Sequence, residues 1–278
     1  MFGVSRQVYY RNIKSRNKRQ NAALAVLEQV RRVRNQMPQI GTRKLYHLLR
    51  ASFRKMSVGR DKLFLILRAN HMLIVPKRSY HITTNSHHRF RKHKNLIDEL
   101  EVSRPEQVWV SDITYLGNRE NPSYLALVTD AYSKKIVGYH VSAHLDTDNC
   151  IKALKMAIAK RIYKGKSLIH HSDRGIQYCS HEYQQVLKSN GITCSMTQSY
   201  DPYQNAVAER VNGILKQEFS IDKYSVELKV RKKMVADSLR IYNTKRPHYS
   251  CYMKTPEQMH LQQQVRIRTY KIINQQKN

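Results

Sequence analysis

Strand-like and helix-like segments alternate from Val108 to Asn243, and their order limits the folds open to this chain. The strand-like segments are short and rich in β-branched and aromatic residues, whereas the helix-like segments carry apolar residues three and four positions apart. Predicted strands cover residues 108–115, 124–130, 136–142, 168–172 and 192–196, and predicted helices cover 147–163, 181–190, 204–219 and 226–243. The order β-β-β-α-β-α-β-α, followed by the last helix, predicts an α/β fold. A meander of three antiparallel strands begins a sheet that is flanked by helices.

Helical periodicity also runs through the first 75 residues, where no strand-like segment interrupts it. We predict helices over 22–35, 42–50 and from Ser57 or Gly59 to Asn70. The residues expected inside are Leu27, Val30, Val33, Leu45, Leu48, Leu49, Leu63, Ile66 and Leu67. The last two helices are short, closely connected and basic on the outside, which indicates an all-α helix-turn-helix region that binds DNA. Its outward basic residues are Arg43, Lys44, Arg60, Lys62 and Arg68. The alternative is a small helical bundle with a solvated basic surface.

The charge of the chain points to a nucleic acid as its partner. Fifty Lys and Arg stand against 20 Asp and Glu, a formal net charge of +30. Residues 1–100 hold 23 basic and 4 acidic residues, a net charge of +19, so the first part predicts a DNA-gripping region. A chain this basic repels itself unless an anion neutralises it, and phosphates do so with release of counterions. The alternatives are a basic surface that serves only solubility and a ribosome-type protein.

Several other classes of protein are disfavoured by the residue pattern. The cysteines, Cys150, Cys179, Cys194 and Cys251, form no CxxC pair and have no regular spacing, which argues against structural zinc and a disulfide framework. The N-terminus has no apolar core of a signal peptide, and no apolar run of 18 residues exists. We therefore expect a protein of the reducing cytoplasm.

A histidine-rich tract separates the two predicted regions. Residues 76–95 contain Pro76, many Lys and Arg, and the four histidines His81, His87, His88 and His93. Such tracts can bind metal. Because cysteines and carboxylates at ligand spacing are missing, we favour a solvated, DNA-facing linker.

Three carboxylates lie in or next to the predicted sheet, where they can approach one another. Asp112 lies within the first strand, Asp173 directly follows the fourth, and Glu209 lies one turn into the helix after the fifth. Neighbouring strands can bring the two aspartates together, with the glutamate added from the side. Three carboxylates in one place repel one another, and hard divalent cations such as Mg²⁺ or Mn²⁺ relieve that repulsion. Two such ions about 4 Å apart promote in-line displacement at phosphorus.

The helix that carries Glu209 has one narrow polar face. At about 100° per residue, Asn205, Glu209, Asn212 and Lys216 fall on one side, and the opposite side carries Val207, Val211, Ile214 and Leu215. We expect Lys216 to bind DNA beside the reacting phosphate, together with Asn205 and Arg210. The alternative for Lys216 is a solvated surface lysine.

Other titratable residues near these strands have simpler interpretations. Asp130 ends the second strand and is predicted to form a turn. Asp146 and Asp148 flank Thr147, and Asp146 is expected to cap a helix and neutralise its N-terminus. One of His170 and His171 can face the site, although packed histidines are more common on strands. Cys179 and Cys194 are expected to be buried, and Asp201-Pro202 to form the turn that leads into the Glu209 helix.

The segments around the three carboxylates resemble a known family. The blocks are Val108-Trp109-Val110-Ser111-Asp112-Ile113-Thr114-Tyr115, His171-Ser172-Asp173-Arg174-Gly175-Ile176-Gln177-Tyr178 and Asp201-Pro202-Tyr203-Gln204-Asn205-Ala206-Val207-Ala208-Glu209-Arg210. Together with the 35 residues between Asp173 and Glu209, they are similar to the DDE motifs of second-frame (OrfB) transposases of the insertion-sequence-three family, which are relatives of retroviral integrases. Matches to further family blocks are Tyr242-Asn243, Arg246-Pro247-His248, Thr255-Pro256-Glu257 and Gly41-Thr42-Arg43-Lys44-Leu45.

This resemblance implies a ribonuclease-H-like core and a transposase that inserts DNA elements. The implied domains are a DNA-binding region over 1–75, a linker over 76–104, the catalytic core over 105–265 and a basic tail over 266–278. The implied chemistry is Mg²⁺-dependent cleavage at the element's ends, followed by attack of the new 3′-hydroxyl on another phosphodiester.

The resemblance also implies binding partners, and two other functions compete with that of a transposase. The implied partners are double-stranded DNA, further copies of the chain on DNA, and an upstream-frame helix-turn-helix protein that is often fused to it. No zinc is carried over, since the His-His-Cys-Cys module of retroviral integrases is missing. The competing functions are a structure-specific nuclease that joins nothing and a DNA-binding regulator with an inactive core.

Overall fold

The computed structural model describes residues 5–75, 93–118, 121–198 and 205–262. The chain divides into two units, Met1–Lys77 and Arg78–Asn278. The predicted tail, most of the predicted linker with His81, His87 and His88, and the predicted Asp201-Pro202 turn lie outside the described residues. The described part of the linker contacts the second unit, because Ile97, Leu100 and Val102 pack against buried residues there.

The first unit is all-α, as predicted. Its helices are α1 (Arg6–Arg34), α2 (Thr42–Leu48), α3 (Arg50–Lys55) and α4 (Arg60–Ala69). Its buried apolar residues are Val26, Leu27, Val30, Met37, Ile40, Leu45, Phe53, Val58, Leu63 and Leu67. The connection between α3 and α4 covers residues 56–59, a length typical of a helix-turn-helix.

Three expectations for this unit were wrong, one of them the turn expected directly after Arg50, where the structure has helix α3. The first helix begins at Arg6 rather than Ala22, because Arg6–Arg34 contains neither Gly nor Pro and is rich in good helix formers even where apolar periodicity is missing. Leu48 is 38% exposed rather than inside, because α2 ends there and Phe53 of the separate helix α3 is buried instead.

The second unit contains the predicted mixed sheet. Its strands are β1 (Val108–Gly117), β2 (Pro122–Asp130), β3 (Ile136–Ser142), β4 (Leu168–Ser172) and β5 (Ile192–Met196). Their order across the sheet is β3-β2-β1-β4-β5. The first three strands form the antiparallel meander, whereas β4 runs parallel to both β1 and β5. The parallel pairs place the ends of β4 and β5 at the same edge.

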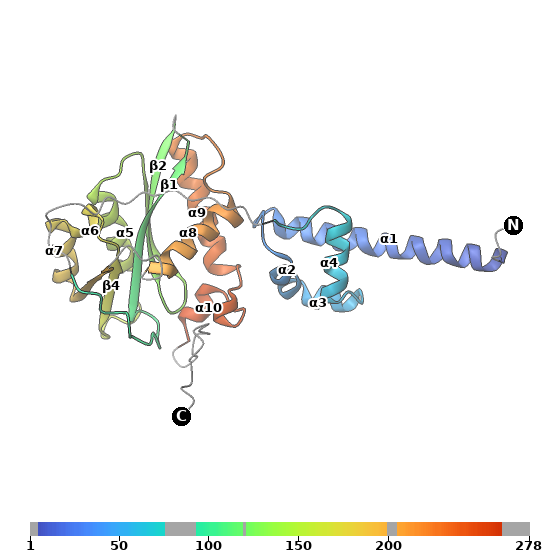
Figure 1. Cartoon of the computed structure of the whole chain (residues 1–278), viewed down its shortest axis with the longest axis horizontal. Coiled ribbons are helices and arrows are strands. Elements are labelled where there is room, and N and C mark those ends of the chain that lie inside the picture. Colours follow the sequence, from blue (N-terminus) through green and yellow to red (C-terminus); the bar gives the residue numbers. More distant parts are fainter. Residues whose placement is uncertain (1–4, 76–92, 119–120, 199–204, 263–278) are drawn as a thin grey trace, which may run out of the picture. The chain divides into compact units, whose positions relative to one another are not determined.

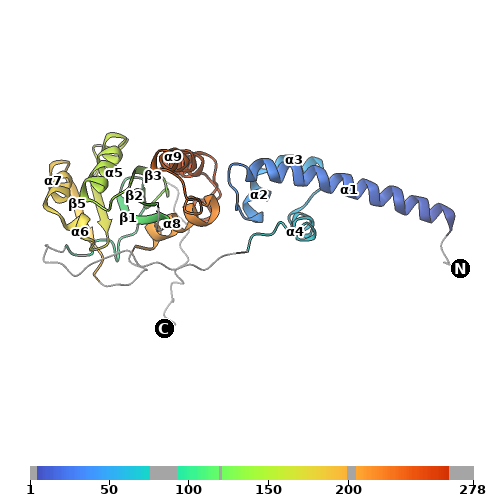
Figure 2. The same ribbon diagram turned by 90° about the horizontal axis from the view of Figure 1, so that it is seen from above.

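Helices cover both faces of this sheet, as Figures 1 and 2 show. One face carries α5 (Thr147–Ala159), α6 (Ile176–Cys179) and α7 (His181–Ser189). The other carries α8 (Ala206–Phe219) and α9 (Leu228–Thr244), and the C-terminal block adds the short helices Tyr249–Cys251 and α10 (Pro256–His260). Of these, α6, Tyr249–Cys251 and α10 were not predicted, because helices this short lack a full apolar period.

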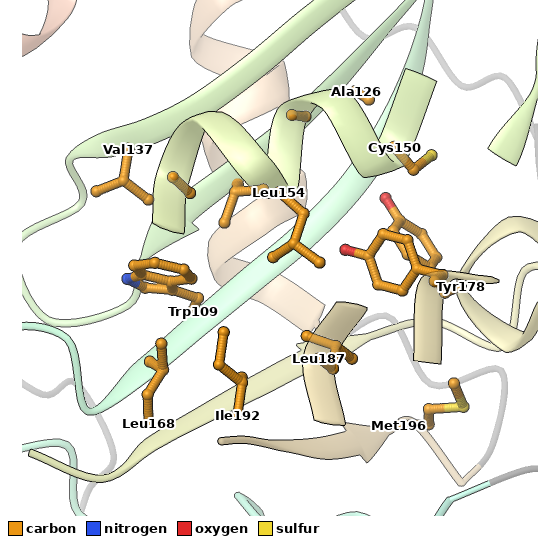
Figure 3. Packing of buried hydrophobic residues seen from close by; sticks show 14 of the residues in the cluster. Trp109, Ala126, Val137, Cys150, Leu154, Leu168, Tyr178, Leu187, Ile192 and Met196 are labelled. Atoms are coloured by element: carbon orange, nitrogen blue, oxygen red, sulfur yellow. The ribbon is translucent and has the colours of Figure 1, made fainter. Parts of the chain in front are cut away.

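The main core lies between the sheet and α5, α6 and α7 (Figure 3). Trp109 and Leu154 are fully buried there, and Tyr178 and Leu187 nearly so. Gly138 allows α5 to come this close, because a Cβ at that position would lie 2.1 Å from the Ala153 carbonyl oxygen. The close packing fixes β1 and β4 beneath the helices.

A buried charged cluster joins the start of β1, the end of α5 and α10. The Glu106 carboxylate accepts hydrogen bonds from the backbone N–H groups of Ile162 and Tyr163, at 2.8 and 3.0 Å, and pairs with Arg161. These N–H groups therefore face Glu106 instead of continuing the helix. Consequently α5 ends at Ala159 rather than near Tyr163, and Ile162 is 51% exposed instead of lying on the buried stripe.

Among the described residues, no helix is both long and apolar enough to span a membrane. None of the four cysteines forms a disulfide, and Cys150, Cys179 and Cys251 are buried while Cys194 is partly buried.

Candidate active site

Asp112 and Asp173 are brought together by the pairing of β1 with β4. The two strands are parallel, and Ser111 pairs with Ser172. One residue further in this register, Asp112 lies beside Asp173, which directly follows β4. Both carboxylates are half-buried. The predicted approach of the two aspartates is therefore confirmed by the strand register.

Asp112 is held by two hydrogen bonds. The backbone N–H of Ile113 donates to Oδ1 at 2.8 Å, and the side-chain amide of Asn212 donates to Oδ2 at 2.7 Å. Burial and then the negative charge of Asp173 raise the pKa of Asp112 to about 7, although both hydrogen bonds act to lower it; the charge of Glu209 adds a smaller increase. Carboxylate repulsion is thus already present in this arrangement.

Asp173 is oriented by the loop that follows it. The backbone N–H of Gly175 donates to Asp173 Oδ1 at 3.0 Å. A Cβ on residue 175 would lie 3.0 Å from that same oxygen, so a larger residue would press on the carboxylate. The Asp-Arg-Gly sequence therefore fixes one carboxylate oxygen.

Glu209 is exposed on the first turn of α8, and two buried asparagines dock that helix on β1. The Asn205 amide donates to the Ser111 carbonyl at 3.2 Å, and the Asn212 amide reaches Asp112. The predicted polar face of α8 thus lies toward the aspartates, while Val211, Ile214 and Leu215 are buried. Sequence periodicity predicted this face but not the contact between Asn212 and Asp112.

The donor atoms at this site suit a hard cation. Carboxylate and amide oxygens are the ligands that Mg²⁺ and Mn²⁺ prefer, and the buried Oδ1 of Asn212 has no hydrogen-bond partner among the described residues. Within the same residues, no three His, Cys, Asp or Glu side chains lie close enough to share one metal ion.

Lys216 is half-buried two turns beyond Glu209. Burial lowers the pKa of its ammonium group, while the negative charges of Asp222 and Asp112 act in the opposite direction. It is therefore not the fully solvated lysine of the alternative interpretation, and its charge interacts with that of Asp112. Arg210 is exposed on the same helix.

The remaining acids near the site have structural partners. Asp130 is fully buried and accepts hydrogen bonds from Glu106 N and from both the backbone and hydroxyl of Ser133, so it shapes the turn after β2 as predicted. The capping predicted for Asp146 is only partly confirmed, because Asp146 is the N-cap residue of α5 but its side chain makes no capping hydrogen bond; Asp148 pairs with Lys152.

Neither histidine of β4 is exposed. His170 is fully buried between the Ser111 hydroxyl (2.7 Å) and the Tyr183 hydroxyl (2.9 Å), and burial lowers its pKa to about 3. His171 contacts the Ser195 hydroxyl at 2.9 Å. Both are packed, hydrogen-bonded residues, which was the more common case expected for histidines on a strand.

The basic residues predicted in the first unit lie on its surface to different degrees. Arg43 is exposed and Lys44 is half-buried. Arg60 pairs with its neighbour Asp61 at 2.9 Å, and Lys62 contacts the Ser57 carbonyl at 3.4 Å. Such exposed pairs are weak and leave these cations available to phosphate.

Comparison with known proteins relates this chain to integrase cores and to proteins of insertion sequences. Two models of the integrase core domain match residues 102–202 and 190–256. An uncharacterized 31 kDa protein of insertion element IS600 from Shigella sonnei is 34% identical over 222 residues, which cover 78% of this chain and 80% of that protein. The transposase InsF for insertion sequence IS3A of Escherichia coli is 34% identical over 167 residues, covering 59% of this chain and 58% of InsF.

The fold is also similar to a solved structure. A chain of the simian T-cell lymphotropic virus intasome, solved in complex with PP2A regulatory subunit B56 gamma, superposes with a TM-score of 0.51 and 21% identity. The match covers 85% of this chain and 81% of that chain. It supports the ribonuclease-H-like assignment of the sheet and its helices.

The burial of Asp112 and the negative charge of Asp173 beside it predict a stability penalty in the absence of metal. Its pKa is about 7 in the folded chain and about 3.9 when unfolded, so between pH 4 and 7 the folded state holds a proton that the unfolded state has lost. Stability should therefore fall as pH rises through this window. Asp112→Asn should flatten this slope and raise the Tm at pH 7, by about 2–4 °C per kcal/mol gained.

The measurement is urea unfolding in chelator at pH 5 and pH 7, followed by the fluorescence of Trp109, the one tryptophan of the chain. Asp148→Asn, at an exposed aspartate paired with Lys152, is the control and should keep the wild-type slope. An unchanged slope in Asp112→Asn would refute the raised pKa of Asp112.

Proposed function

The chain belongs to the IS3 family of insertion-sequence transposases with an integrase core domain, and from this membership we propose that Asp112, Asp173 and Glu209 are its catalytic carboxylates. A transposase of this family is a polynucleotidyl transferase that cleaves DNA and transfers a strand. The observation that carries the residue assignment is the β1–β4 register, which puts Asp112 beside Asp173 under the helix of Glu209.

The proposed reaction has two displacements at phosphorus. Water first attacks the phosphodiester at an element end, and the bond to the 3′-oxygen breaks to leave a 3′-hydroxyl. That hydroxyl then attacks a phosphodiester of a second DNA site and releases its 3′-oxygen, so one bond forms for each that breaks. When bound, two divalent cations, Mg²⁺ or Mn²⁺, would neutralise the carboxylates, activate the attacking oxygen and stabilise the leaving oxygen.

The protein's own residues serve this reaction by position. Asn212 and Ile113 N hold both oxygens of Asp112, and Gly175 N holds one oxygen of Asp173. Asn205 ties the start of α8 to β1, so its buried side chain supports a positioning role more than a DNA contact. Preorganised charge of this kind accounts for most of the rate in phosphoryl transfer.

We propose double-stranded DNA as substrate, with further copies of this chain and the upstream-frame protein as partners on it. Acting on chromosomal DNA would place the protein at the nucleoid in the cytoplasm. The exposed cations of α2 and α4 would grip phosphates, and Lys216 and Arg210 would contact the reacting strand.

Substitution of any of the three carboxylates should abolish joining. Asp112→Asn, Asp173→Asn and Glu209→Gln should each lower strand transfer by about 100-fold or more, because metal ligation needs full negative charge, while DNA binding stays within about twofold, since phosphate contacts by Lys and Arg supply it. Strand transfer and DNA binding are measured side by side with end-containing DNA and Mg²⁺ or Mn²⁺. The control is Asp148→Asn.

Two outcomes would contradict this assignment. Substantial joining by any of the three variants would remove that residue from the site, and robust joining in excess chelator would exclude divalent metal. Release of ends without joining, in the wild type, would instead indicate a nuclease.

Lys216 offers a test of the strand-contacting face. Lys216→Ala should weaken end binding and strand transfer about tenfold, the effect of losing one charge-assisted contact, and Lys216→Arg should retain part of both. Lys223→Ala, at an exposed lysine beyond α8, is the matched control. Equal activities of Lys216→Ala and this control would make Lys216 a structural lysine.

The first unit is tested through salt dependence. Each phosphate contact contributes roughly 0.9 to the slope of log K against log salt. The double variant Arg43→Ala/Lys62→Ala should therefore reduce that slope by up to about 2, measured by fluorescence anisotropy of labelled duplex DNA. Lys188→Ala, exposed on α7, should leave the slope unchanged. An unaltered slope in the double variant would show that α2 and α4 do not grip phosphates.

A further inference from the structure

The C-terminal end of α8 is held, like its N-terminal end, by a residue from another element. Glu218, in the last turn of α8, accepts two hydrogen bonds from Arg246, from Nε at 2.8 Å and from the second guanidinium nitrogen at 2.7 Å. The Arg246 side chain is 2% exposed and that of Glu218 is 15% exposed. This is a bidentate, nearly dry ion pair, the geometry in which an Arg–carboxylate contact is most directional.

Arg246 is itself fixed to the rest of the second unit. One guanidinium nitrogen lies 2.8 Å from His248 Nε2, and the guanidinium lies over the Tyr242 ring at 5.8 Å. The Tyr242 hydroxyl donates to the Lys134 carbonyl at 2.9 Å. Arg246 is therefore connected, through Tyr242, to the turn between β2 and β3.

Asn243 adds a second connection between this block and the β2–β3 region. Its side chain accepts from the backbone N–H of Ile136 at 3.0 Å and donates to the Ile136 carbonyl at 2.9 Å, so it pairs with the first residue of β3. The Tyr-Asn and Arg-Pro-His blocks thus form one connection from the meander to α8.

The electrostatics of α8 favour this partner. Glu218 lies near the helix C-terminus, where the macrodipole disfavours a carboxylate. Arg246 follows the C-terminus of α9, where a cation is favoured, and its backbone N–H donates to the Ile241 carbonyl. Lysine would keep the charge but lose the two-pronged contact.

We propose that Arg246 is a positioning residue for the catalytic helix: through Glu218 it fixes the axial position and rotation of α8, and so the placement of Glu209 and Asn212 against Asp112 and Asp173. The inference rests on the proposed function of these carboxylates. Glu209 and Glu218 are nine residues apart, about 14 Å along the axis. A displacement at one end of α8 therefore moves the other, and misplacement by about 1 Å costs about 100-fold in rate.

The test compares two conservative substitutions at buried arginines. Arg246→Lys should weaken Mn²⁺ binding, measured by isothermal titration calorimetry on the full chain, by about tenfold, and should raise the Mn²⁺ concentration needed for half-maximal strand transfer. The matched control is Arg161→Lys, which alters the buried pair with Glu106. The control should lower the Tm, followed by Trp109 fluorescence, without changing Mn²⁺ affinity.

A second variant guards against simple loss of stability. Glu218→Gln should reproduce the weaker Mn²⁺ binding. The double variant Arg246→Lys/Glu218→Gln should bind Mn²⁺ no more weakly than either single variant, because both substitutions disrupt the same interaction between Arg246 and Glu218. Wild-type Mn²⁺ affinity in Arg246→Lys and Glu218→Gln, or additive losses in the double variant, would overturn the proposal.

Asp112→Asn separates this proposal from the proposed function. It should abolish Mn²⁺ binding altogether. If Asp112→Asn binds Mn²⁺ as the wild type does, the carboxylate assignment fails, and the positioning role of Arg246 falls with it. If only the Arg246 and Glu218 variants bind normally, the catalytic assignment stands and the positioning role alone is refuted.

Discussion

The parallel pairing of β1 with β4 is the constraint on which the rest of the second unit depends. It places the buried Asp112 beside Asp173, and burial together with the charge of Asp173 raises the pKa of Asp112 to about 7, so the fold keeps a carboxylate in a place that disfavours its charge. The core against α5, α6 and α7 must hold the two strands in that register. A site of this kind is stable because the packing beneath it is close, as Trp109 and Leu154 illustrate.

The other half of the site is a helix that has to be located against those strands. Its N-terminal end is docked by buried amides, Asn205 on the Ser111 carbonyl and Asn212 on Asp112, and its C-terminal end by the Glu218–Arg246 pair. Amide side chains can contact the aspartates without adding charge to the site. The Glu218–Arg246 pair can be fully charged because it lies at the other end of the helix, away from the aspartates. The C-terminal block therefore helps to hold the helix that carries Glu209, although it contributes no carboxylate to the candidate site.

Burial and hydrogen-bond partners separate the structural acidic residues from the candidate metal ligands, which sequence position alone does not. Asp130 and Glu106 are more deeply buried than Asp112, yet each is satisfied by backbone N–H groups and hydroxyls that make a turn or end a helix. Their negative charge is offset locally, by His260 and Arg161 for Glu106. Asp112 instead faces other carboxylates, so its charge stays available to a cation.

The sequence by itself determined the order of the strands and of the longer helices and the polar face of α8, and it singled out the three carboxylates now proposed as catalytic, because apolar periodicity and local motif blocks are properties of neighbouring residues. It did not determine where α1 begins, where α5 ends or that Leu48 is exposed, since helix ends depend on partners such as Glu106 that arrive from elsewhere in the chain. Only the tertiary structure decided that Asn212 holds Asp112 and that Arg246 holds Glu218. The residues of those contacts are 100 and 28 positions apart, and no local pattern specifies which distant side chains the packed sheet brings within hydrogen-bond distance.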